Sequence, residues 1–128
     1  MKLYEITSLL DCKIFTKNIY QENIEISYAF SCDLMSDALM LLRNVGLDFC
    51  YSGVLITGLV TVQGVRTAEM LDLPLIILVR GKQPNELVIK EAEEANIIII
   101  GTPETMFSTN GKLYKKGLIG ITEYNAKL

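Results

Sequence analysis

Three short apolar segments, each followed closely by a glycine, constrain the fold of this chain more than any other feature. Residues 53–57, 75–79 and 97–100 are almost entirely aliphatic, and Gly58, Gly81 and Gly101 follow them. A continuous apolar strand is typical of a sheet that is buried on both faces. Since each segment is separated from the next by enough chain for a helix, the pattern predicts an α/β fold. We expect three layers, with a mainly parallel central sheet.

The spacing of apolar residues predicts the helices that cover this sheet. Leu34, Ala38, Leu42 and Val45 recur at helical offsets, and Gly46 is a natural end for that helix. Nothing in the sequence suggests a linker or a second domain, so residues 1–128 are predicted to form one domain. The predicted helices cover 4–10, 34–45, 62–71 and 84–95. A last helix is predicted to begin at Pro103 after a cap by Thr102, with Asn110-Gly111 as a candidate break. Further strands are predicted over 13–16 and 24–30, and a loop over 47–52.

Composition excludes several classes of function. The chain has 128 residues, with 12 basic and 15 acidic side chains, so its net charge of −3 lacks the basic excess of a nucleic-acid-binding protein. It has no histidine, and its 3 cysteines form no CxxC pair, so we expect no metal site and no cofactor. Scattered cysteines suit a reducing cytoplasm. No apolar run reaches the roughly 20 residues of a membrane helix, and no signal peptide is recognised.

The predicted strand ends are the best candidate for a ligand site. In open parallel sheets, ligands bind beyond the carboxyl ends of the strands. Glycines there let a ligand approach the backbone, and helix N-termini favour anions. A small anion such as a nucleotide phosphate or an acyl phosphate is the expected ligand. The alternative is that the glycines only end strands. The candidate ligand-binding residues are Thr57, Gly58, Arg80, Gly81, Lys82, Gly101 and Thr102.

A second polar group follows the strand predicted over 24–30. Ser31, Cys32, Asp33, Ser36 and Asp37 could hold a metal or activate a nucleophile, or Asp33 and Ser36 could simply cap the next helix. No histidine is present to activate Cys32. The sequence also lacks GxxxxGK[ST] and GxGxxG. We therefore assign no catalytic residues, and list Asp33, Ser36, Asp37, Arg66 and Glu69 as candidate interface residues.

A family resemblance is carried by Leu55–Val60, Val65–Leu73, Leu75–Lys82, Ala29–Leu39, and Met106–Phe107 with Gly111–Tyr114. These stretches resemble the DRTGG domain. The resemblance implies a Rossmann-like domain similar to the amino-terminal domain of HPr kinase/phosphorylase, found in bacteria. Such domains are thought to regulate or to dimerise, and they carry no agreed catalytic residues. The letters DRTGG themselves are absent, and the turn in their place reads Thr57-Gly58-Leu59-Val60-Thr61. The resemblance covers roughly residues 1–118.

Three functional hypotheses follow. The first is a regulatory, ligand-sensing or dimerisation module without catalysis, a homodimer that binds a small anion at the strand ends. The second is an accessory enzyme of phosphoryl or acyl transfer, for which Asp33, Asp37 and Cys32 would supply the nucleophile or base. The third is a scaffold that contacts a protein partner through the helix carrying Arg66.

Overall fold

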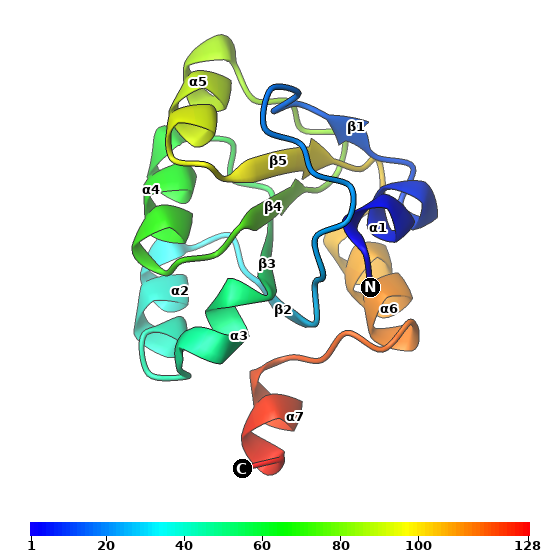
Figure 1. The fold of residues 1–128 in the computed structure, drawn as a ribbon, viewed down its shortest axis with the longest axis vertical. Coiled ribbons are helices and arrows are strands. Elements are labelled where there is room, and N and C mark those ends of the chain that lie inside the picture. Colours follow the sequence, from blue (N-terminus) through cyan, green and yellow to red (C-terminus); the bar gives the residue numbers. More distant parts are fainter.

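One mainly parallel sheet organises the chain, which the computed structural model describes over residues 1–128. The strand order is β1-β5-β4-β3-β2. The neighbours β2, β3, β4 and β5 pair in parallel, and β1 pairs with β5 in the antiparallel sense. The carboxyl ends of the four parallel strands therefore share one edge (Figure 1). The strands are β1 (Lys13–Ile14), β2 (Tyr28–Ser31), β3 (Gly53–Thr57), β4 (Leu75–Leu78) and β5 (Ile98–Gly101).

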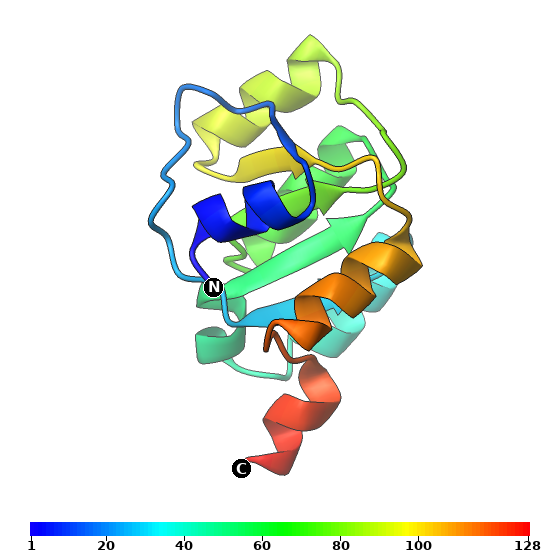
Figure 2. The same ribbon diagram turned by 90° about the vertical axis from the view of Figure 1, so that its right-hand side faces the viewer.

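Helices cover both faces of the sheet, which confirms the predicted three-layer α/β architecture. One layer holds α2, α4 and α5 with the short α3, and the other holds α1 and α6 (Figures 1 and 2). The last helix, α7, packs beside β2, the outermost parallel strand of the sheet. The helices are α1 (Leu3–Leu9), α2 (Met35–Leu42), α3 (Leu47–Tyr51), α4 (Val62–Met70), α5 (Glu86–Glu94), α6 (Met106–Lys115) and α7 (Ile121–Ala126).

The buried core is divided by the sheet into two clusters. Alternate residues of each strand point to opposite faces, so Leu55 packs towards α2 and α4, whereas Val54 and Ile56 pack towards α1 and α6. Every residue of β3, β4 and β5 is buried. This burial on both faces is the physical reason that these segments are continuously apolar in the sequence.

Helix ends connect the layers tightly. Asp72 and Asn96 follow α4 and α5 with φ of 60° and 58°, so each helix stops in a left-handed residue. The residue after each of these closes the helix end with a backbone hydrogen bond. The Leu73 N–H donates to the Ala68 carbonyl at 2.9 Å, and the Ile97 N–H donates to the Ala92 carbonyl at 2.8 Å. These turns lead directly into β4 and β5.

Four local predictions were wrong. Residues 47–51 form α3 rather than a loop, because Phe49 and Cys50 find a buried face to pack against. The helix α6 begins after Thr105 rather than at Pro103, and it continues through Asn110-Gly111 without interruption. The strand β2 starts only at Tyr28. The helix α7 was not predicted.

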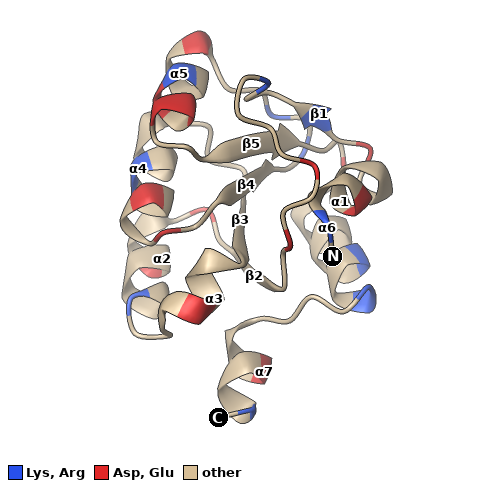
Figure 3. Ribbon diagram, viewed as in Figure 1, with Lys and Arg blue, Asp and Glu red and all other residues tan.

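Charges of both signs are interspersed on the helical surface. Figure 3 shows basic and acidic residues alternating over α4 and α5, with basic residues also at the end of α6. Lys112 and Lys115 lie in the last turn of α6, where they interact favourably with the helix dipole. None of the helices is both long and apolar enough to cross a lipid bilayer.

Candidate functional site

The carboxyl ends of β2, β3 and β4 converge on the carboxylate of Asp33. Its Oδ1 accepts hydrogen bonds from the Gly58 backbone N–H (2.7 Å) and from Thr57 Oγ1 (3.3 Å). Thr57 Oγ1 in turn accepts from the Leu59 N–H at 3.0 Å. We call Asp33, Thr57, Gly58 and Arg80 the strand-end cluster. Asp33 was predicted as an interface residue or a helix cap, but Leu34 is the N-cap of α2, so Asp33 is free to contact β3.

Arg80 completes this cluster from the end of β4. Its Nη1 lies 3.9 Å from Asp33 Oδ2, and both side chains are about half exposed, at 44% and 55%. A pair this exposed contributes little to stability, roughly 0–1 kcal/mol. The guanidinium lies directly over Gly58: a Cβ added at residue 58 would come within 2.8 Å of Arg80 Cζ. Glycine is therefore required at residue 58 for this close approach.

The backbone of Arg80 explains how its side chain reaches Gly58. Arg80 has φ of 59°, in the left-handed region that few arginines adopt. Its N–H donates to the Glu104 carbonyl at 2.8 Å, and the Gly81 N–H donates to the Thr102 carbonyl at 2.9 Å. These bonds hold the turn against the segment before α6 and send Arg80 and Lys82 in different directions.

The seven predicted ligand residues are consequently divided between two places. Thr57, Gly58 and Arg80 belong to the strand-end cluster. The other four line a separate hollow of about 190 Å³ beside β1, which also contains Lys13 and Asp11. This second group consists of Gly81, Lys82, Gly101 and Thr102.

Two residues of the second group have a structural role. Thr102 is fully buried, and its Oγ1 donates to the Leu10 carbonyl at 2.6 Å, which ties β5 to the end of α1. A Cβ at Gly101 would lie 2.5 Å from Phe15 Cε2, so the Phe15 ring occupies the space above this glycine. The antiparallel edge strand β1, which carries Phe15 after it, thus closes the sheet at a place where we expected a ligand.

The helices that follow β4 and β5 also offer fewer free backbone N–H groups to a ligand than the sequence suggested. The side chain of Asn85 accepts from the Val88 N–H at 2.9 Å at the start of α5, and Thr105 Oγ1 accepts from the Ser108 N–H at 3.2 Å at the start of α6. Both helices begin several residues after their strands, with their first amides already capped. The starts of α5 and α6 therefore offer fewer free N–H groups to a ligand than the strand-end cluster.

The remaining sequence candidates lie around this cluster. Ser36 and Asp37 are in the first turn of α2, and Arg66 and Glu69 are on α4, where both are exposed. Cys32 donates its thiol to the Leu34 carbonyl at 3.4 Å. Burial, with smaller contributions from Asp37 and Asp33, raises the pKa of this thiol, which disfavours it as a nucleophile.

A larger groove lies between β2 and α6, beside Ile119, whose carbonyl accepts from the Ala29 N–H at the outer edge of β2. It measures about 450 Å³, and we call it the β2–α6 groove. Gly120 and Glu123 line its far end at the start of α7. Sequence analysis did not single it out, although the i, i+4, i+7 spacing of three of its α6 residues places them on one helix face. The groove is lined by Ala29 and Ser31 of β2 and by Phe107, Asn110, Gly111 and Tyr114 of α6.

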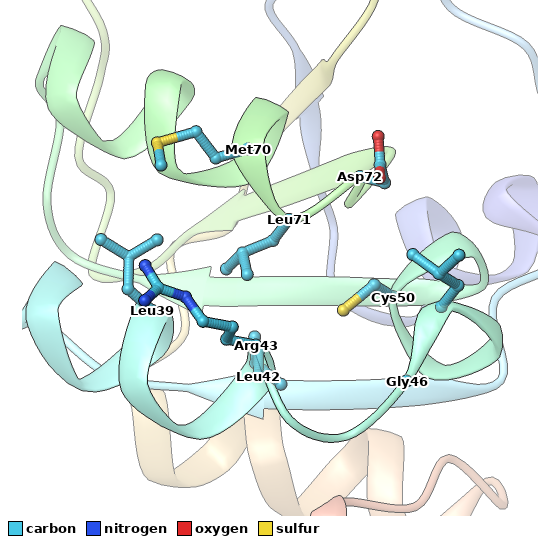
Figure 4. A pocket seen from close by; sticks show the side chains of 9 residues that line it. Leu39, Leu42, Arg43, Gly46, Cys50, Met70, Leu71 and Asp72 are labelled. Carbon is cyan, nitrogen blue, oxygen red and sulfur yellow. The ribbon is translucent and has the colours of Figure 1, made fainter.

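A third hollow lies in the opposite helical layer. Figure 4 shows Leu39 of α2 and Arg43, the C-cap of α2, on the same side as Met70 of α4, with Cys50 of α3 at the other end beyond Leu71. Its volume is about 190 Å³. Burial raises the pKa of the Cys50 thiol, and the negative charge of Asp72 raises it further. The hollow is less than half the size of the β2–α6 groove.

The fold and its strand-end cluster define a class, a three-layer α/β domain with its polar site at the carboxyl ends of parallel strands. No family model and no curated protein matches the sequence. The structure is similar to the CBS and DRTGG domains of the regulatory region of Clostridium perfringens pyrophosphatase, solved in complex with the activator diadenosine tetraphosphate. The TM-score is 0.63 at 18% sequence identity, over 86% of this chain and 44% of that one.

This likeness establishes a shared fold, since the identity is too low to carry residue roles across. The chain spans less than half the length of the structure it matches. The α/β fold expected from the DRTGG resemblance is thus confirmed.

Proposed function

We propose that residues 1–128 act as one ligand-sensing regulatory module that binds a small anion at the strand-end cluster. The observation that carries this proposal is the Asp33 carboxylate, which is bound by the Gly58 N–H at 2.7 Å with the Arg80 guanidinium nearby. A backbone donor and an arginine are the groups that commonly hold phosphate and carboxylate oxygens. Asp33 therefore occupies the position that we assign to an oxyanion of the ligand.

The ligand in this proposal competes with Asp33. An incoming phosphate takes the Gly58 N–H and pairs with Arg80, and Asp33 turns outwards to solvent. Because Asp33 is joined to the first turn of α2 and is more than half exposed, its release moves little of the core. The exchange gives the module two states that differ in conformation at the start of α2. A partner that binds one of these states more tightly would respond to the ligand.

The structural neighbour supports the same kind of function. Its regulatory region was solved with diadenosine tetraphosphate as activator. A phosphate-bearing regulator in that protein agrees with a small phosphate-bearing ligand here.

Isothermal titration calorimetry with pyrophosphate and acetyl phosphate tests the proposal. We expect saturable binding of at least one of these anions to the wild type. Arg80→Asn should lower the affinity about tenfold, because a charge-assisted hydrogen bond contributes about 1.5–3 kcal/mol before solvent screening reduces it. Asparagine is chosen because it tolerates the positive φ of residue 80. Arg43→Asn, an exposed arginine on the hollow of Figure 4, is the matched control. Equal affinity of both variants would reject the strand-end cluster as the site.

We also propose that the module forms a homodimer through the outer surface of α2 and α4. Met40 of α2 and Met70 of α4 expose 63% and 67% of their surface, and burial of these side chains against a second copy would stabilise a dimer. We expect light scattering to give the mass of a dimer for the wild type and of a monomer for Met70→Glu. The control Leu87→Glu changes an exposed leucine on α5 and is expected to stay dimeric. A monomeric wild type at high concentration would contradict this interface.

A further inference from the structure

The β2–α6 groove presents an unusual helix face to solvent. Phe107, Gly111 and Tyr114 lie at i, i+4 and i+7 on α6, and the two rings are exposed at 86% and 61%. Apart from the adjacent residues and the backbone of α6 itself, no atom lies within 4 Å of the place where a Cβ of Gly111 would be. A glycine in the interior of a helix lowers the stability of the helix relative to alanine, and the rings on either side of it gain little from burial in the free domain. Together they leave a flat open floor between two rings, which suits a planar ligand.

Polar groups in the groove are fixed by the fold. Ser31 Oγ donates to Asn110 Oδ1 at 2.5 Å, which orients the amide and leaves its Nδ2 free to donate. Asn110 Oδ1 keeps a second lone pair. Glu123 Oε1 accepts from the Gly120 N–H at 2.8 Å, and its other oxygen is free to accept. The groove thus combines a donor and an acceptor on one amide with a separate carboxylate acceptor.

The groove leads towards the strand-end cluster. Asp33 lies two residues beyond Ser31, a distance of at most about 7 Å along an extended chain. The helix α6 begins at the carboxyl edge of the sheet, as Figure 2 shows, so Phe107 lies one turn nearer that edge than Asn110. Phe107 is therefore on the side of Asn110 that faces the carboxyl edge of the sheet, where the strand-end cluster lies.

These features fit the parts of a nucleotide. Aromatic side chains stack on bases. An asparagine amide matches the N6 donor and N7 acceptor of adenine, whereas the corresponding edge of guanine presents two acceptors. A volume of about 450 Å³ is within the range of small-molecule sites. The short distance to Asp33 is comparable with the distance between a base and its first phosphate.

We infer that the β2–α6 groove binds the base of an adenine nucleotide whose phosphates bind at the strand-end cluster. The inference rests on the proposed function for its phosphate half and adds the ligand class. The adenine ring stacks against Phe107 over Gly111, the Asn110 amide contacts the adenine edge, and Glu123 accepts from a ribose hydroxyl.

Calorimetry with ADP, GDP and pyrophosphate separates the two halves of the site. We expect the wild type to bind ADP at least tenfold more tightly than pyrophosphate or GDP. Phe107→Ala should weaken ADP binding about tenfold, the loss of one base–aromatic stack, and leave pyrophosphate binding unchanged. Leu87→Ala, which truncates an exposed leucine on α5, is the control and should leave both affinities unchanged.

Gly111→Ala distinguishes a lost contact from a lost fold. Alanine favours the helix over glycine, and the space around residue 111 is open, so this variant should melt at a higher temperature than the wild type. Its methyl group nevertheless stands on the floor of the groove, so ADP affinity should fall while pyrophosphate affinity stays constant.

Three other outcomes would contradict adenine binding in the β2–α6 groove. If ADP and pyrophosphate bind equally, or if Phe107→Ala and Gly111→Ala leave ADP affinity unchanged, the base does not bind in the groove, although the anion site stands. If Phe107→Ala changes only the oligomeric mass, the aromatic face is a protein contact. If neither ADP nor pyrophosphate binds, the proposed function fails together with the inference.

Discussion

The carboxylate of Asp33 accepts a hydrogen bond of 2.7 Å from the backbone N–H of Gly58, across two neighbouring parallel strands. This bond places an acidic side chain where an anionic ligand would bind in a parallel α/β sheet. The protein thus supplies its own anion to the donors at the end of β3. Ligand affinity at this place should then depend as much on releasing Asp33 as on attracting the ligand.

Replacing Asp33 by alanine should strengthen anion binding. The variant removes a like charge and frees the Gly58 N–H, so we expect the affinity for pyrophosphate to rise about tenfold, which corresponds to about 1.4 kcal/mol. The same variant should lower the free energy of unfolding by about 1–2 kcal/mol, because a charge-assisted hydrogen bond is lost. Calorimetry and urea unfolding measure the two effects. Asp37→Ala, in the first turn of α2, is the control, and an Asp33→Ala variant with weaker binding would show that Asp33 helps to hold the ligand.

Alanine at the two strand-end glycines should have opposite effects on stability and binding. At Gly58 the new Cβ meets the flexible end of Arg80, which swings away, so we expect a small change in stability and weaker pyrophosphate binding. At Gly101 the new Cβ meets the packed ring of Phe15 at 2.5 Å. Overpacking there should cost roughly 1–3 kcal/mol and leave pyrophosphate binding unchanged. Thermal unfolding and calorimetry on both variants check this, and weaker binding by Gly101→Ala would return Gly101 to the ligand site.

The sheet was predictable because its signal is local and strong. Aliphatic segments such as Leu75–Leu78 are apolar on both faces, and only a sheet covered on both sides buries such a segment. The alternation of strands and amphipathic helices then determined that the strands are parallel. Helix α3 could not be predicted in this way, because its 5 residues are held by the burial of Phe49 rather than by any helical period.

The site was predictable only in part, since a sequence does not tell which way a side chain turns. Both Arg80 and Lys82 were expected at one anion site, but the positive φ of Arg80 directs it to Gly58 while Lys82 lines the hollow beside β1. The contact of Ser31 with Asn110 joins residues 79 positions apart. No pattern along the chain reports such a contact, so the β2–α6 groove appears only when α6 is placed against β2.

Alkaline pH should destabilise the fold through Cys12. Burial raises the pKa of this thiol from 9.0 to about 12, and the negative charge of Asp11 makes a smaller contribution in the same direction. The unfolded chain therefore loses the thiol proton first, and the stability contributed by the neutral thiol is complete below pH 9 and is lost as the pH rises towards 12. Urea unfolding between pH 8 and 11 should show a steeper loss for the wild type than for Cys12→Ala. Parallel pH profiles of the two proteins would rule out Cys12 as the cause.

The aromatic cluster that anchors α7 should control the far end of the groove. Tyr124 of α7 packs edge-on against Tyr28 (5.1 Å between ring centroids) and Phe49 (5.3 Å), and these two rings stack on each other at 5.0 Å. Each such pair is worth about 0.5–1.5 kcal/mol beyond its buried area. Tyr124→Ala should therefore release α7 from β2 at a cost of about 1–3 kcal/mol, and Glu123 moves with it.

Because Glu123 lines the groove that we assign to the nucleoside, Tyr124→Ala should also weaken ADP binding severalfold without changing pyrophosphate binding. Tyr51→Ala removes an exposed tyrosine of α3 that makes no ring pair of this kind, so it serves as the control for the loss of a tyrosine. Hydrogen exchange of residues 121–126 reports the release of α7 directly. If exchange accelerates while ADP affinity is unchanged, α7 packs against β2 for stability alone, and the nucleoside contacts only β2 and α6.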